Sequence, residues 1–228
     1  MLLFCIGACI CGQYTSVTPF LFYQDQYQCS SIPSGFISCL EYVCSLPAGN
    51  RANYLPTPSM YTLANKFGDY RCSDVASTIN TSILIMFIGT IIAYLFMSIL
   101  GGYFGRKTFM IIGAFSSIIG TLVAVVASSI YFASVGLLIG SFGGQILFNI
   151  GFTIISEIVI EEKRETCLVI FQVFYSFGHL SNTAFYFFIR DWEKVFIISY
   201  IIPATIFIIC YIIIAVDTPL ALIKNLSP

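Results

Sequence analysis

The sequence predicts an all-α membrane protein, a bundle of six transmembrane helices. Hydrophobic residues make up 58% of the chain and charged residues only 9%, whereas a soluble domain carries about 25% charged residues. The mean hydropathy is +0.91, so the chain lacks the polar surface of a soluble domain and lipid is the expected solvent for most of it. The formal net charge of −1 gives no reason to expect a nucleic-acid partner.

Six segments are long and apolar enough to cross a bilayer. Each has about 20 residues or more, which is the length that a helix needs at a rise of 1.5 Å per residue. Backbone groups in lipid must be paired within the segment, so helices are expected, and the alternating polarity of transmembrane strands is missing. The segments cover residues 2–23, 82–104, 108–130, 132–155, 167–189 and 195–215.

Charged residues gather in the predicted loops on one side of the bundle. The stretch "SEIVIEEKRE" (156–165) holds six charged residues and indicates a turn between the fourth and fifth spans. Loops rich in Lys and Arg stay cytoplasmic, so both termini are expected in the cytoplasm, with the plasma membrane as the expected location. Residues 81–228 then hold spans two to six and a short cytoplasmic tail. The basic residues on this side are Arg106, Lys107, Lys163, Arg164 and Lys224.

The long loop 24–80 between the first and second spans is expected outside the cytosol. Its three basic residues conflict with the charge rule, but its cysteines favour the outside. Four cysteines in one extracytosolic loop predict two disulfides with three possible connectivities, against the alternative of four free thiols. These cysteines are Cys29, Cys39, Cys44 and Cys72.

Neutral polar residues form rows along three spans whose interiors carry essentially no charge. Since charge inside a span usually marks function, its absence argues against a proton relay built from carboxylates. Two readings of the rows stay open, either contacts to a solute or hydrogen bonds between helices. The lone His179 is either a packing partner or a group that titrates near neutral pH. The rows comprise Gln13, Tyr14 and Ser16, then Gln145, Asn149 and Thr153, then Gln172, Tyr175, Ser176 and His179.

Glycines recur every four residues in the fourth span, at Gly136, Gly140 and Gly144. Such a spacing predicts a smooth groove that lets another helix approach closely. Enzyme constellations are missing from the sequence, which has no phosphate-binding loop and no nucleophile beside a histidine and an acid. The loop cysteines lack the pairing with histidine that a metal site needs. The chain is therefore expected to be no enzyme and to need no cofactor or metal.

Three motifs at the span boundaries resemble those of the major facilitator superfamily of transporters. Glu157 and Arg164 match the acidic and basic pair that this family places between spans four and five. If the helix continued, their side chains would lie on one face, about 10 Å apart along the axis. The segment "DTPLALI" after span six matches at Asp217 and at the Thr and Pro that follow it, while Leu220 replaces an expected Arg.

The third motif is "SILGGYFGRK" between spans two and three. Gly105, Arg106 and Lys107 fit the end of the family signature Gly-x3-Asp-(Arg/Lys)-x-Gly-Arg-(Arg/Lys), but Gly102 and Tyr103 replace the Asp and the basic residue. The resemblance implies a cytoplasmic charge network that gates the transporter, built from Gly105, Arg106, Lys107, Glu157, Arg164 and Asp217. Within it, Arg106 is predicted to meet Glu157, with Arg164 close by.

The whole chain resembles the N-terminal six-helix half of a transporter of this family. Within the family it resembles the organic cation transporter-like and sugar-porter-like branches. That implies passage of a small organic solute by alternating access between two halves. A second half or a second copy of the chain would then be the partner. A membrane subunit or scaffold that no longer transports is the alternative. Spans one, four and five face the cavity in the family, so the resemblance implies solute contacts at Gln13, Gln145, Asn149, Thr153, Gln172, Tyr175 and His179.

Overall fold

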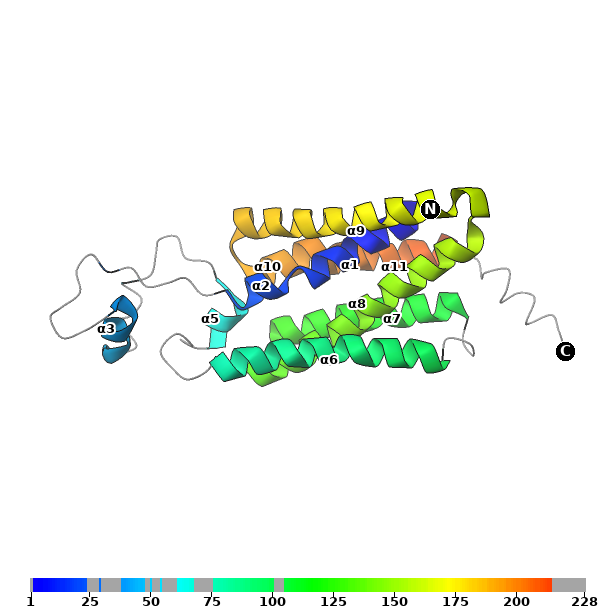
Figure 1. Ribbon diagram of the computed structural model, residues 1–228. Coiled ribbons are helices and arrows are strands. Elements are labelled where there is room, and N and C mark those ends of the chain that lie inside the picture. The colour runs from blue at the N-terminus through cyan, green and yellow to red at the C-terminus, as the bar shows by residue number, and fades with distance from the viewer. Residues whose placement is uncertain are drawn as a thin grey trace.

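A computed structural model shows a bundle of long helices that lie side by side, with short helices at one end (Figure 1). The structure describes residues 2–23, 29, 38–47, 50, 54, 61–67, 76–100 and 105–214. α1 begins and α11 ends at the end of the bundle where α8 passes into α9, and α5 lies at the opposite end. The elements are α1 (Leu2–Thr15), α2 (Thr18–Leu21), α3 (Cys39–Ser45), α5 (Leu63–Phe67), α6 (Ala76–Leu100), α7 (Arg106–Val126), α8 (Ile130–Ile158), α9 (Glu161–Ile189), α10 (Trp192–Val195), the π-helix η2 (Phe196–Ile201) and α11 (Ile202–Ile214).

Five helical segments in the described part of the chain are long and apolar enough to span a bilayer. The predicted fifth span, 167–189, is a helix too, since it lies within the 29 residues of α9. It is not among these five segments because Gln172, His179, Asn182 and neighbouring hydroxyl-bearing residues lower its mean hydropathy. The segments that qualify are Leu3–Leu21, Thr78–Ile99, Arg106–Val126, Ile130–Ile158 and Trp192–Ile213.

Several predicted boundaries differ from the structure. The first span is not one continuous helix, because α1 ends at Thr15 and α2 starts at Thr18 with a proline in its first turn, where a missing N–H is harmless. The second span begins at Ala76, inside the segment predicted as loop 24–80. The last span contains six π-helical residues, Phe196–Ile201, just before Pro203.

The predicted turn within "SEIVIEEKRE" is present but shorter than the stretch, most of which is helical. α8 continues to Ile158, the chain turns at Val159 and Ile160, and α9 begins at Glu161. Two acidic residues therefore occupy the first turn of α9, where the positive end of the helix dipole stabilises them. The interruption also means that Glu157 and Arg164 do not share one continuous helix face.

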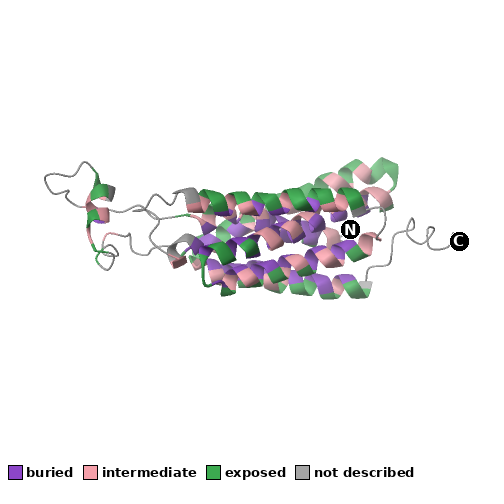
Figure 2. Ribbon diagram, turned by 90° about the horizontal axis from the view of Figure 1, so that it is seen from below, coloured by how far each residue is buried: buried purple, intermediate pink, exposed green. Residues whose placement is uncertain are grey.

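α8 lies in the middle of one layer, packed against α6, α7 and α1, while α1 lies between α8 and α9. Buried residues follow the inner faces of the helices and exposed residues follow the outer ones (Figure 2). Most of the exposed large side chains on α6 and α11 are apolar, as expected of faces that meet lipid. The core thus consists of helix–helix contacts within an apolar exterior.

Glycines allow the closest helix crossings. A Cβ at Gly120 of α7 would lie 2.2 Å from the backbone nitrogen of Gly140 and 2.6 Å from the carbonyl oxygen of Gly136, so only glycine fits there. The close helix approach predicted for the glycines of α8 is therefore confirmed at Gly136 and Gly140. At Gly144 a Cβ would meet nothing nearer than the Tyr14 ring at 3.6 Å, so this glycine is not needed for close approach.

Disulfides are present in the cysteine-rich loop. One joins Cys29 to Cys39, and Cys44 is disulfide-bonded as well. If the loop forms two internal disulfides, this pairing excludes two of the three connectivities and assigns Cys44 to Cys72. Cys72 lies outside the described residues, so that second pair stays a prediction. The other cysteines, Cys5, Cys9, Cys11, Cys167 and Cys210, are free.

The end of the loop between the first and second spans is attached to the bundle through α5 and the turn between α9 and α10. Tyr61 donates its N–H to the carbonyl of Arg190 at 2.9 Å and accepts from the N–H of Trp192 at 3.2 Å. Lys66 donates to Glu193 Oε1 at 2.8 Å and to the Val125 carbonyl at 2.9 Å. The lysine therefore neutralises a carboxylate and also satisfies one of the free carbonyls at the end of α7.

Replacing Lys66 by Met should destabilise this end of the bundle. The change leaves Glu193 and the Val125 carbonyl without their shared donor, and charged hydrogen bonds of this kind contribute about 1.5–3 kcal/mol. Lys194→Met is the matched control, because the Lys194 side chain is 69% exposed in its pair with Asp191 and such pairs contribute about 0–1 kcal/mol. Thermal unfolding can be followed by the fluorescence of Trp192, the single tryptophan, and equal midpoints for both variants would contradict the expectation.

Candidate functional site

A polar seam joins α1 to α9 in the middle of the bundle. Gln13 Nε2 donates to Ser181 Oγ at 2.9 Å, and Asn182 Nδ2 donates to Ser16 Oγ at 3.0 Å. The helices come close enough for these bonds because Gly178 of α9 lies against the backbone of α1 at Cys9. Gln13 is 8% exposed, so its amide serves the contact between helices rather than an open surface.

Thr15 is the residue of this seam that contacts two predicted site residues at once. Its hydroxyl lies 2.9 Å from the Tyr175 hydroxyl and 3.2 Å from His179 Nε2. The rings of Tyr175 and His179 also meet edge to face, with centroids 4.8 Å apart. The sequence pattern pointed to Gln13, Tyr14 and Ser16 but not to Thr15, although its place within this polar run was the available signal.

Tyr14 has a structural role. Its hydroxyl donates to the Leu137 carbonyl at 3.1 Å, and its ring packs against Gly140 and Tyr200 inside the bundle.

The polar row on α8 is aligned as predicted but bonds within its own helix and to α6. Asn149 Nδ2 donates to the Gln145 carbonyl and Thr153 Oγ1 donates to the Asn149 carbonyl, both at 2.8 Å. Gln145 Nε2 donates to the Tyr94 hydroxyl of α6 at 2.7 Å. None of the hydrogen bonds among the described residues joins this row to the row on α9.

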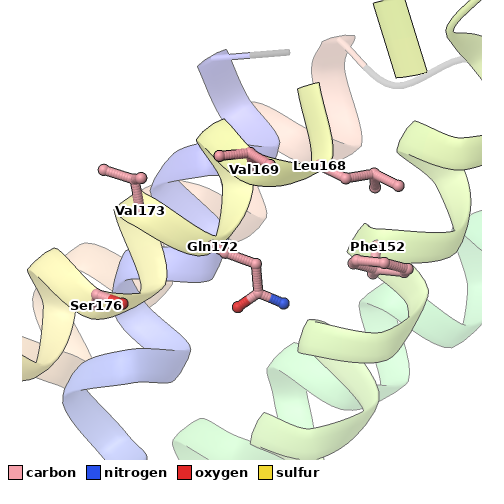
Figure 3. Close-up of a pocket in the computed structure, with 6 residues that line it drawn as sticks. All are labelled: Phe152, Leu168, Val169, Gln172, Val173 and Ser176. Carbon is pink, nitrogen blue, oxygen red and sulfur yellow. The ribbon is translucent and has the colours of Figure 1, made fainter. Parts of the chain in front are cut away.

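An open depression of about 380 Å³ lies between α8 and α9. Gln172 projects from α9 into this space opposite Phe152 of α8 (Figure 3). Ser176 lines it one turn further along α9, and Leu168, Val169 and Val173 complete the lining. Gln172 and Ser176 are exposed residues, and no hydrogen bond to the Gln172 side chain occurs within the described chain. His179 follows on the next turn of the same helix.

The charge network at the other end of α8 is present in part. Arg106 Nη2 lies 2.9 Å from Glu157 Oε1, so the predicted contact is confirmed. Arg164 forms no ion pair with Glu157, and Arg164 Nε is buried without a hydrogen-bond partner in the described residues, as is Glu157 Oε2. Gly105 is the N-cap of α7, Lys107 is half-buried on its first turn, and Asp217 lies outside the described residues.

Within the residues that the structure describes, no group of three His, Cys, Asp or Glu side chains could hold a metal ion. The polar groups of the site are neutral amides, hydroxyls and one imidazole, and the rest of the lining of the depression is apolar. These groups can exchange hydrogen bonds with a solute, and they offer it no fixed counter-charge.

Residues 52–225 match the family model described as "Sugar (and other) transporter". No curated protein matches the chain in sequence. The structure is similar to that of a D-xylose–proton symporter, with a TM-score of 0.64 and 17% identity over 97% of this chain and 49% of that one. It is also similar to the xylose transporter XylE of E. coli in its inward-open conformation, with a TM-score of 0.63 and 16% identity over 96% and 47% of the two chains.

The chain thus spans about half the length of the solved transporters that it matches. At these identities the likeness shows the fold, that of one half of a major facilitator transporter. Together with its apolar helices, the family match makes the chain an integral, multi-pass membrane protein. The resemblance to the organic cation branch stays a prediction.

Proposed function

Since the chain belongs to the sugar (and other) transporter family, we propose that it forms one half of a transporter that passes a small, neutral, hydroxyl-bearing solute. The site lies on the faces of α1, α8 and α9, and a second six-helix half closes it from the other side. A second half is needed because the depression between α8 and α9 is open and cannot enclose a solute by itself.

The observation that carries this proposal is the uncharged polar face of α9. Gln172 and Ser176 present a carboxamide and a hydroxyl to the depression, and such groups can both donate hydrogen bonds to a sugar and accept them. An organic cation would lose its hydration here without meeting a carboxylate, which is costly in a nonpolar site. A neutral polyol is therefore favoured over the organic cations that the resemblance also implied.

The other predicted residues take roles around the same cavity. Gln145, Asn149 and Thr153 on α8 form the part of the cavity wall beside α6, and Tyr175 and His179 form the part beside α1. The ion pair of Arg106 with Glu157 belongs to the gate at the cytoplasmic end. The termini then lie in the cytoplasm and the cysteine-rich loop outside the plasma membrane, which is where disulfides persist.

Replacing Gln172 by Ala should weaken binding and uptake of the solute. Loss of one or two hydrogen bonds to a neutral hydroxyl weakens affinity by about fivefold to tenfold. The measurements are binding of radiolabelled D-xylose to the chain in nanodiscs and its uptake into proteoliposomes. Phe177→Ala is the control, because Phe177 is exposed on the same helix and does not line the depression.

Tetraethylammonium serves as the organic-cation probe in the same assays. Its uptake in preference to D-xylose would contradict the neutral-solute proposal. If the chain neither binds nor transports either probe, with or without a co-reconstituted C-terminal half, the result would support a membrane scaffold and contradict transport.

A further inference from the structure

We propose that Thr15 is a positioning residue that holds the ring of His179 in its Nε2–H tautomer, so that Nδ1 stands as a hydrogen-bond acceptor for the solute. The tautomer of the ring depends on the contacts of Thr15 alone, whereas the role of Nδ1 toward a solute rests on the proposed function. Thr15 belongs to α1 and His179 to α9. A contact between these two helices therefore determines which ring nitrogen of His179 can accept a hydrogen bond.

The Thr15 hydroxyl has one proton and two lone pairs to share among its neighbours. Oγ1 lies 3.2 Å from the Cys11 carbonyl and 3.1 Å from the Gly12 carbonyl of its own helix. A helical threonine commonly donates to such a carbonyl. The two lone pairs then remain for the two groups across the seam, the Tyr175 hydroxyl at 2.9 Å and His179 Nε2 at 3.2 Å.

The two tautomers of the neutral ring differ in the number of donors that they leave unpaired. With the proton on Nε2, each of the three donors has an acceptor: Thr15 donates to its own helix, and Tyr175 and His179 both donate to Thr15. With the proton on Nδ1, that N–H has no acceptor within the described residues. Unpaired N–H donors are rarer in proteins than unpaired acceptors, so the contacts favour Nε2–H.

The consequence is a defined acceptor on the face of α9. The acceptor Nδ1 is left without a protein donor among the described residues, one turn beyond Ser176 in the direction away from Gln172. An sp² nitrogen that can only accept selects a solute group that donates, such as the hydroxyl of a sugar, and disfavours a carbonyl or ether oxygen at that position. Thr15 therefore contributes to specificity without contacting the solute.

The test uses the fact that His179 is the only histidine in the chain. Histidine labelled with ¹⁵N on both ring nitrogens gives one pair of signals from the full chain in nanodiscs, and their shifts report which nitrogen carries the proton. We expect a protonated Nε2 and a bare Nδ1 in the wild type. Thr15→Val should yield a mixture of tautomers, while Thr15→Ser should restore the wild-type pattern.

Thr205→Val is the matched control, since Thr205 donates to the Ile201 carbonyl of its own helix in the same way but has no side-chain hydrogen bond across helices among the described residues. D-xylose binding should weaken about fivefold in Thr15→Val and stay unchanged in Thr205→Val. A wild-type ring with the proton on Nδ1, or on both nitrogens, would overturn the inference whatever the chain transports. The expected tautomer in a chain that binds no D-xylose supports the positioning by Thr15 and counts against the proposed function.

Discussion

Replacing Gly12 by Ala should destabilise the bundle strongly, although it adds only one methyl group. A Cβ at this position would lie 2.0 Å from the Tyr175 carbonyl oxygen, a backbone atom that cannot rotate away. α1 and α9 would have to separate, and the hydrogen bonds of the seam would lengthen with them. We expect a loss of about 3 kcal/mol or more in the free energy of unfolding, measured as a lower midpoint of thermal unfolding in detergent.

The direction of this effect is itself informative, because Gly→Ala inside a helix normally stabilises it by about 0.5–1 kcal/mol. Gly144→Ala is the control, since a Cβ there meets only ordinary contacts with the Tyr14 ring, at 3.6 Å and beyond. It should leave the midpoint unchanged or raise it slightly. If Gly12→Ala behaves like Gly144→Ala, α1 and α9 do not cross as closely as the structure has them.

Cysteines placed on the polar faces of α8 and α9 should crosslink to a partner in liposomes. Gln172 is exposed and its side chain has no hydrogen-bond partner in the described residues, and an unpaired amide in hydrocarbon costs roughly 2–7 kcal/mol. Association with a second copy, or with a separate C-terminal half, removes this cost. Asn149→Cys and Ser176→Cys, in a background without Cys167 and Cys210, should therefore give crosslinked products under mild oxidation.

The control for this experiment is Ile119→Cys on α7, whose side chain is apolar and 51% exposed. A position that faces lipid should crosslink only at the low level of random collision. A folded, monodisperse monomer in mild detergent, with no more crosslinking at positions 149 and 176 than at 119, would contradict association through this face.

Composition and periodicity alone determined much of this protein. Long apolar runs in a medium without water can only be helices, so the span positions and the family resemblance followed from local sequence. The Arg106–Glu157 contact was also predictable, because both residues are charged and lie at the same end of neighbouring spans. Helix ends were less predictable, as at Val159 and Ile160, where one or two residues decide between a turn and a continuous helix.

The tertiary structure alone decided which polar groups meet. Thr15 contacts Tyr175 and His179 because Gly12 and Gly178 let two backbones approach, and these contacts join residues 160 and 164 positions apart in the sequence. Likewise, Lys66 reaches Glu193 and the end of α7 only because α5 lies at the end of the bundle where α7 ends and α10 begins (Figure 1). Helix propensity and hydropathy are local quantities, whereas hydrogen bonds between helices depend on the angle and distance at which the helices pack.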